Sequence, residues 1–95
     1  MRVHIRVKNH KVTVGRRSIH LTRREFQIFC LIAAGRGDLV RREDILRAVW
    51  PHTAVCAVAL DQHISSIRRK AGPRVVRTLH TLGYLMPGDI SLNGC

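Results

Sequence analysis

The apolar residues of this chain change their spacing twice, and this change restricts the possible folds more than any other feature. In the first 21 residues they alternate with polar residues, as Val3, Ile5 and Val7 do, which indicates strands with one buried face. Between residues 22 and 71 they recur every three or four positions, which is the period of a helix. Short strands at 75–79 and 81–85, with a turn near His80, then predict a terminal hairpin.

The first helix has a well-marked beginning. Thr22 and Glu25 have the spacing of a capping box, in which the threonine hydroxyl and the glutamate carboxylate each accept a hydrogen bond from the other's backbone amide. Leu21 and Phe26 flank this cap as the two halves of a hydrophobic staple. Because glycine ends helices, we expect this helix to stop at Gly35.

Two more helices are predicted. The second runs from Arg42 to about Trp50, carries two acids in its first turn and is stopped by Pro51. The third covers residues 57–71, and it has one apolar stripe and several polar faces. The stripe is formed by Leu60, Ile64, Ile67 and Ala71.

One domain accounts for the chain of 95 residues, because no repeat or linker divides it. The predicted fold is of the α+β class, a winged helix-turn-helix with an N-terminal antiparallel sheet, three helices and a C-terminal β-hairpin wing. We expect residues 1–87 to form this domain. Residues 88–95 show no clear pattern and are expected to be a C-terminal tail.

The charge of the chain predicts a polyanionic partner. Seventeen lysines and arginines against six acids give a net charge of +11, which favours nucleic acid or an anionic membrane. No stretch approaches the roughly 20 apolar residues of a membrane span, and the start lacks a secretory apolar core. Three irregularly spaced cysteines fit reduced thiols. Together with the predicted winged helix-turn-helix, whose third helix would enter the major groove, these features predict a cytoplasmic protein that binds double-stranded DNA and no membrane.

The sequence does not indicate an enzyme. Paired carboxylates, a nucleophile with its base and a glycine-rich phosphate loop are all missing from it. His52, Cys56 and His63 lack the paired spacing of zinc ligands. We expect no catalytic residue, no metal and no cofactor.

Four segments in register resemble one known family. The segments LTRREF at 21–26, REDILRAVW at 42–50, LDQHISSIRRK at 60–70 and VRTLHTLGY at 76–84 resemble the first helix, second helix, recognition helix and wing of the OmpR/PhoB-type winged-helix family. These are effector domains of bacterial response regulators in two-component systems. The resemblance implies a transcriptional regulator that binds promoter DNA, often as head-to-tail pairs. It also implies a contact with RNA polymerase through the loop from Pro51 to Val58.

The resemblance also implies where DNA binds. His63, Ser65, Ser66 and Arg68 fall where the family's recognition helix meets bases and phosphates, Trp50 matches a residue that packs on the backbone, and Thr78 and His80 fall on the wing. Charge and position add Arg69 at the end of the third helix, and Arg74 and Arg77 in the wing, where a narrow minor groove attracts arginine. We expect Trp50 to be half-buried against the third helix.

Some residues depart from the family pattern and leave alternatives open. Ser65 and Ser66 stand where relatives often carry arginine, and His80 and Thr81 replace a frequent Arg-Gly in the wing, so fewer cations would face the groove. The fold could instead serve as a protein-interaction module that binds RNA polymerase or another regulator through its apolar loop, or as a nonspecific DNA coater. No receiver domain precedes the effector, so we expect an excised piece or a stand-alone protein.

Overall fold

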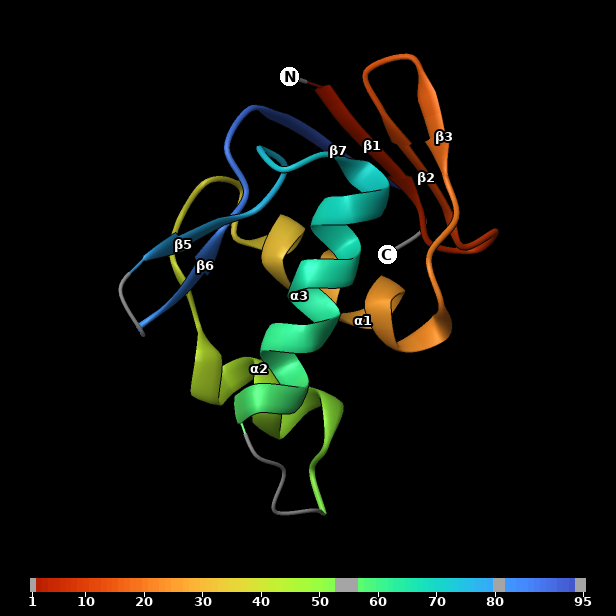
Figure 1. Cartoon of the computed structure of the whole chain (residues 1–95). Coiled ribbons are helices and arrows are strands. Elements are labelled where there is room, and N and C mark those ends of the chain that lie inside the picture. Colours follow the sequence, from red (N-terminus) through yellow and green to blue (C-terminus); the bar gives the residue numbers. More distant parts are fainter. Residues whose placement is uncertain (1, 53–56, 80–81, 94–95) are drawn as a thin grey trace.

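Two sheets and three helices make up the part of the chain that the computed structural model describes, which is residues 2–52, 57–79 and 82–93 (Figure 1). Their order confirms the predicted winged-helix arrangement of the α+β class. The elements are β1 (Arg2–Arg6), β2 (Lys11–Val14), β3 (Arg17–Ile19), α1 (Arg23–Ala34), β4 (Val40–Arg41), α2 (Arg42–Val49), α3 (Ala57–Ala71), β5 (Arg77–Leu79), β6 (Gly83–Leu85) and β7 (Asp89–Asn93).

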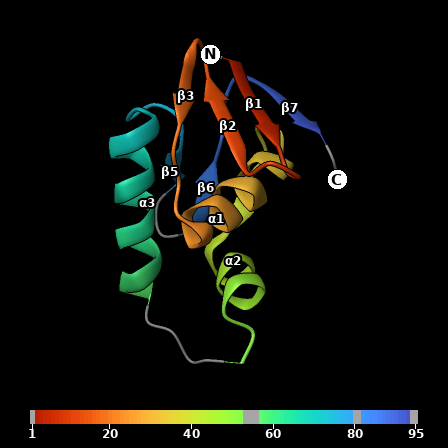
Figure 2. The same ribbon diagram turned by 90° about the vertical axis from the view of Figure 1, so that its right-hand side faces the viewer.

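The N-terminal sheet has the strand order β3-β2-β1-β7. β1 and β2 pair in antiparallel fashion, with Val3 opposite Val14 and Ile5 opposite Val12. All four side chains are buried, while their neighbours along each strand are at least partly exposed. The predicted one-sided alternation is thus confirmed, and the apolar face packs over α1 (Figure 2).

The strand β7 corrects the expectation that residues 88–95 form a patternless tail. Residues 89–93 pair in parallel with β1, which aligns Ile90 with Val3 and Leu92 with Ile5. Ile90 and Leu92 are partly buried and pack on the core. This segment therefore completes the N-terminal sheet.

The helix α1 begins at the predicted cap. The Thr22 hydroxyl accepts a hydrogen bond from the Glu25 amide at 3.3 Å, and the Glu25 carboxylate accepts one from the Thr22 amide at 2.9 Å. The helix ends at Ala34, before Gly35. Its buried face carries Phe26 and Phe29 into the core below the sheet.

The helix α3 lies at one edge of the molecule, with one face turned away from the rest of the fold (Figure 2). Its bounds agree with the prediction, and the apolar stripe of Leu60, Ile64, Ile67 and Ala71 is buried. After the helix, Gly72 adopts a φ of +110°, which favours glycine, and its amide donates to the Arg68 carbonyl at 2.9 Å. The chain then turns towards the wing.

The second sheet has the order β4-β6-β5 and contains the wing. The hairpin strands are shorter than predicted, because Val75 and Val76 are buried in a bend before β5. β4 is an additional strand that the sequence analysis did not predict. It approaches Gly83 so closely that a Cβ there would lie 2.1 Å from the Val40 carbonyl oxygen, so this pairing requires glycine. His80 and Thr81, at the predicted turn, lie outside the described residues.

Candidate nucleic-acid interface

The exposed residues of α3 lie along one side of the helix, because they recur every three or four positions, and we call this side the outer face of α3. They are Val58, Asp61, Gln62, Ser65 and Arg69. Of the predicted DNA-binding residues in α3, Ser65 and Arg69 therefore face solvent, whereas His63, Ser66 and Arg68 are half-buried.

Ser66 is engaged inside the protein with a buried carboxylate. Its hydroxyl donates to Glu25 Oε2 at 2.6 Å, and Lys70 Nζ lies 2.6 Å from Glu25 Oε1. Burial by itself would raise the pKa of Glu25, but the hydrogen bonds from Lys70, Ser66 and the Thr22 amide outweigh it and lower the pKa to about 2. Ser66 and Lys70 thus tie α3 to the beginning of α1, which sequence reasoning missed because it used Glu25 only as a cap.

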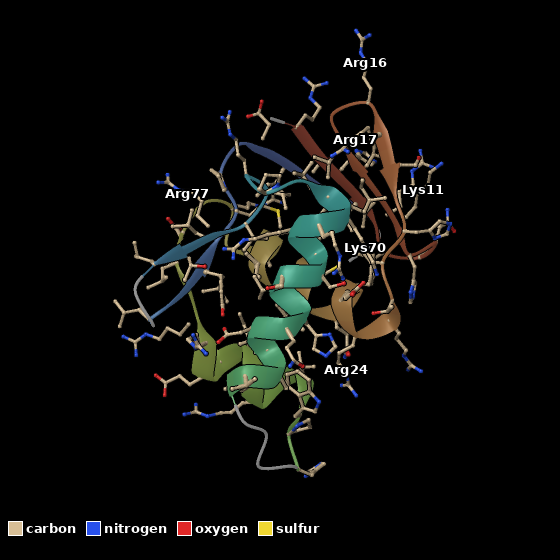
Figure 3. The ribbon with its side chains drawn as sticks, in the orientation of Figure 1. Lys11, Arg16, Arg17, Arg24, Lys70 and Arg77 are labelled. Carbon is tan, nitrogen blue, oxygen red and sulfur yellow. The ribbon has the colours of Figure 1, made fainter. Side chains whose placement is uncertain are left out.

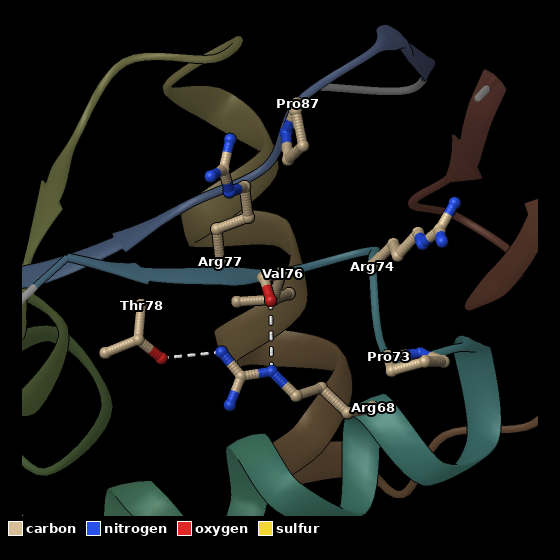
Figure 4. Close-up of a pocket in the computed structure, with 7 residues that line it drawn as sticks. All are labelled: Arg68, Pro73, Arg74, Val76, Arg77, Thr78 and Pro87. Atoms are coloured by element: carbon tan, nitrogen blue, oxygen red, sulfur yellow. Dashed lines mark hydrogen bonds between the residues drawn. The ribbon is translucent and has the colours of Figure 1, made fainter.

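Arg68 connects α3 to the wing. Its Nε donates to the Val76 carbonyl at 3.0 Å and its Nη2 donates to the Thr78 hydroxyl at 2.6 Å (Figure 4). The guanidinium therefore positions the first strand of the wing relative to the helix. These two bonds could not be predicted from the sequence, because both partners lie beyond the turn that follows α3.

Next to Arg68 is an open concavity of about 570 Å³, the wing hollow, which is lined by Arg68, Pro73, Arg74, Val76, Arg77, Thr78 and Pro87. Arg74 and Arg77 are exposed. No carboxylate is among these lining residues. The structure thus brings together Arg68, Arg74, Arg77 and Thr78, which the sequence analysis proposed separately.

Trp50 is half-buried against α3, as expected. Its ring stacks on the His63 ring with centroids 5.8 Å apart, and the Arg24 guanidinium lies 5.2 Å from the Trp50 ring centroid. Arg24 Nη1 also donates to the Val49 carbonyl at 2.8 Å. These contacts place an aromatic pair and a cation beside the beginning of α1.

Asp61, the acidic residue of the outer face of α3, already has partners within the protein. Arg42 Nη2 lies 3.2 Å from Asp61 Oδ1, and the Tyr84 hydroxyl donates to the same oxygen at 2.5 Å. Burial, together with the hydrogen bond to Asp61, raises the pKa of Tyr84 to about 12, so the phenol stays protonated. The Asp61 charge, which would repel a polyanion, is therefore countered by Arg42 at the start of α2.

On the side of α3 away from the wing, Arg17 of β3 reaches the end of the helix. Its Nη2 donates to the Ala71 carbonyl at 3.0 Å. Figure 3 shows Arg17 and Lys70 on one side of α3 and Arg77 on the other. Arg17 was not among the residues predicted from the sequence, because its neighbours in space are distant along the chain.

Other predicted features lie wholly or partly outside the described residues. These are His80 and residues 53–56 of the loop proposed to contact RNA polymerase. Within residues 2–52, 57–79 and 82–93, no group of three or more histidine, cysteine or acidic side chains could hold a metal ion. In the same ranges, no helix has the length and apolar character to cross a membrane.

Comparisons with known proteins identify the family. The family model described as "Transcriptional regulatory protein, C terminal" matches residues 15–86. Response regulator ArlR of Staphylococcus aureus is 31% identical over 81 residues, which cover 80% of this chain and 37% of ArlR. The chain thus spans little more than a third of the length of the curated relatives it matches.

Two solved structures share the fold. The DNA-binding domain of Bacillus subtilis CssR superposes with a TM-score of 0.76 at 29% identity, covering 90% of this chain and 99% of that one. Response regulator DrrB of Thermotoga maritima, an OmpR/PhoB homologue, superposes with a TM-score of 0.74 at 30% identity, covering 82% of this chain and 38% of DrrB. The chain belongs to the OmpR/PhoB-type family of response-regulator DNA-binding domains, which are transcriptional regulatory modules and not enzymes.

Proposed function

We propose that this chain binds double-stranded DNA sequence-specifically and regulates transcription, with α3 in the major groove and the wing beside it. The observation that carries the proposal is the outer face of α3. It presents Gln62, Ser65 and Arg69 to solvent, and its acid is paired with Arg42. A helix fits the major groove, and side chains of these types read base edges or bind phosphates.

The wing supplies the second part of the proposed interface. Arg74 and Arg77 are exposed beside the end of α3, where they can reach the backbone or a narrow minor groove. Arg68 donates to the Val76 carbonyl and to the Thr78 hydroxyl, so the role we propose for Arg68 and Thr78 is to hold the wing at a fixed position. Ser66 holds α3 on Glu25 in the same way.

Trp50 and His63 form the opposite edge of this interface. Both rings are partly exposed, and the indole N–H can donate to a phosphate while the ring rests on His63. Arg24 above the Trp50 ring adds a positive charge to the same place.

A substitution of Arg69 tests the proposal more cleanly than one of Arg68, because Arg68 also holds the wing. Arg69 is exposed, and its hydrogen bond within the described chain is a long one of 3.3 Å to Ser66. We expect Arg69→Ala to weaken binding of a duplex selected from a random pool by about fivefold or more at about 150 mM salt. Fluorescence anisotropy measures this change.

Arg47→Ala is the matched control for Arg69→Ala. Arg47 is also exposed, but it lies on α2, where it pairs with Glu43 and Asp44. The Arg47→Ala substitution removes the same charge, but at a position away from the outer face of α3, so we expect the affinity for the duplex to change by less than about twofold. Equal losses in both variants, or no loss in Arg69→Ala, would contradict the proposed binding mode. Equal affinity of the unaltered protein for unrelated duplexes would point to a nonspecific DNA coater instead.

Three finer statements stay predictions that follow from the family. They are a contact with RNA polymerase through the loop from Pro51 to Val58, head-to-tail pairing on DNA, and a cytoplasmic location, which access to promoter DNA requires. The exposed Val58 side chain, with 56% of its surface accessible, favours a protein contact at the end of this loop. A protein-interaction module is therefore the second candidate, and it predicts that partner capture survives Arg69→Ala.

A further inference from the structure

The N-terminal sheet contributes an arginine to the end of the proposed recognition helix. Arg17 is the first residue of β3, where it pairs with Val14. From there its side chain reaches the last turn of α3 and donates one hydrogen bond, from Nη2 to the Ala71 carbonyl. A guanidinium has five N–H donors, so most of its donors remain available after this bond.

Arg17 lines a second open concavity, which we call the sheet hollow. This space of about 570 Å³ is bounded by Arg17, Ser65, Arg68, Arg69, Gly72 and Pro73. Three guanidinium groups and one hydroxyl thus border it, and none of these six residues is acidic. Because Arg68 bonds to the wing, Arg17 and Arg69 are the cations that can turn towards a ligand in the hollow.

The chemistry of the sheet hollow fits a phosphate group. Arginine binds phosphate oxygens through paired N–H donors, and a serine hydroxyl donates to the same oxygens. None of its lining residues carries a carboxylate, so an anion there meets no side chain of like charge among them. Its open form suits a phosphate that is part of a large molecule.

The position of the sheet hollow indicates that this large molecule is a DNA duplex. It adjoins Ser65 and Arg69 of the outer face of α3, so a duplex lying on this face would also cover the hollow. Arg17 and Arg77 lie on opposite sides of α3 (Figure 3). A duplex in contact with the wing on one side of the helix would thus present backbone phosphates to Arg17 on the other side.

We propose that Arg17 and Arg69 form a binding site for a DNA backbone phosphate, so that the N-terminal sheet is part of the DNA-binding surface. This inference rests on the proposed function. It adds a contact on the side of α3 opposite the wing, and the two sides together fix the orientation of the helix in the groove.

The test compares Arg17→Gln with Arg16→Gln. Glutamine removes the charge and keeps a polar amide side chain, although a shorter one. Arg16 is the exposed residue just before Arg17, in the turn between β2 and β3, but its side chain extends away from α3 and does not line the hollow (Figure 3). The two variants therefore have equal net charge and differ in the position of the lost cation.

The dependence of log K on log salt concentration for a selected duplex is the readout. One lost phosphate contact lowers the slope by about 0.9. We expect this reduction in Arg17→Gln and a slope equal to that of the unaltered protein in Arg16→Gln. Equal slopes in all three proteins overturn the inference. If the unaltered protein itself shows no DNA binding, the proposed function fails first.

Two further measurements keep the result interpretable. Thermal unfolding with and without inorganic phosphate shows whether the hollow takes a free anion; stabilisation that Arg17→Gln abolishes, with an unchanged DNA slope, overturns the assignment to DNA. Should Arg17→Gln not fold, single methylphosphonate substitutions in the duplex replace it. With the unaltered protein we expect sensitive phosphates on both sides of α3, and sensitivity on the wing side alone contradicts the site.

Discussion

Replacing Glu25 with glutamine is expected to lower the free energy of unfolding at pH 7 by about 3 kcal/mol. The Glu25 side chain is only 5% exposed and accepts hydrogen bonds from Lys70, Ser66 and the Thr22 amide. These donors hold its pKa at about 2 instead of the ordinary 4.5, and each pKa unit corresponds to about 1.4 kcal/mol in favour of the charged form in the folded state. Glutamine can keep the cap but cannot pair with Lys70.

The same shift predicts how stability depends on pH. Because the pKa of Glu25 is lower in the folded protein, its contribution is fully present above about pH 4.5 and is lost as the pH falls towards about 2. Urea unfolding at several pH values should therefore show the unaltered protein and Glu25→Gln converging as the pH falls through this window.

Glu43→Gln is the control for Glu25→Gln. Glu43 is 60% exposed, and its contacts with Arg41 and Arg47, at 3.6 and 3.8 Å, are surface ion pairs. Such pairs contribute about 1 kcal/mol at most, so we expect a small change at pH 7. A loss in Glu25→Gln no larger than in Glu43→Gln would show that the buried carboxylate does not hold α1 and α3 together.

Affinity for DNA is expected to fall by about a thousandfold between about 50 and 200 mM salt, if about six phosphates are contacted. The net charge of +11 and the exposed arginines on both sides of α3 are the physical reason, since each cation that meets a phosphate releases condensed counterions. Anisotropy titrations of one duplex at several salt concentrations measure the slope, for which we expect about −5.

The Arg47→Ala variant provides the control for this titration. It lowers the net charge without removing a proposed phosphate contact, so its slope should match that of the unaltered protein. An affinity that hardly changes over this salt range would mean that the arginines around α3 do not meet the DNA backbone.

Local signals in the sequence predicted the helices well. The Thr22–Glu25 capping box depends on residues three positions apart, and the stripe along α3 depends on its own periodicity, so neither needs knowledge of the rest of the fold. β7 was missed although Ile90 and Leu92 alternate, because two apolar residues are a weak signal and the partner strand β1 lies at the other end of the chain.

The candidate site was predictable in outline but not in its contacts. The sequence placed Ser65, Arg69, Arg74 and Arg77 on a polar surface, and the structure leaves all four exposed. It could not show that Arg68 bonds to the wing, because the spacing of apolar residues indicates which face of a helix is polar but not which residues its side chains bond to. The same limit hid Arg17, whose partner at Ala71 is brought close only by the tertiary fold.

The most direct test of the account is to map where a selected duplex changes the backbone amide chemical shifts of the isotope-labelled protein. We predict the largest changes along the outer face of α3 and in the wing, with smaller ones near Arg17. The far side of α1, around Leu31 and Ala34, should stay unchanged. Changes concentrated around Leu31 and Ala34, with α3 unaffected, would contradict the claim that α3 is the DNA-binding helix.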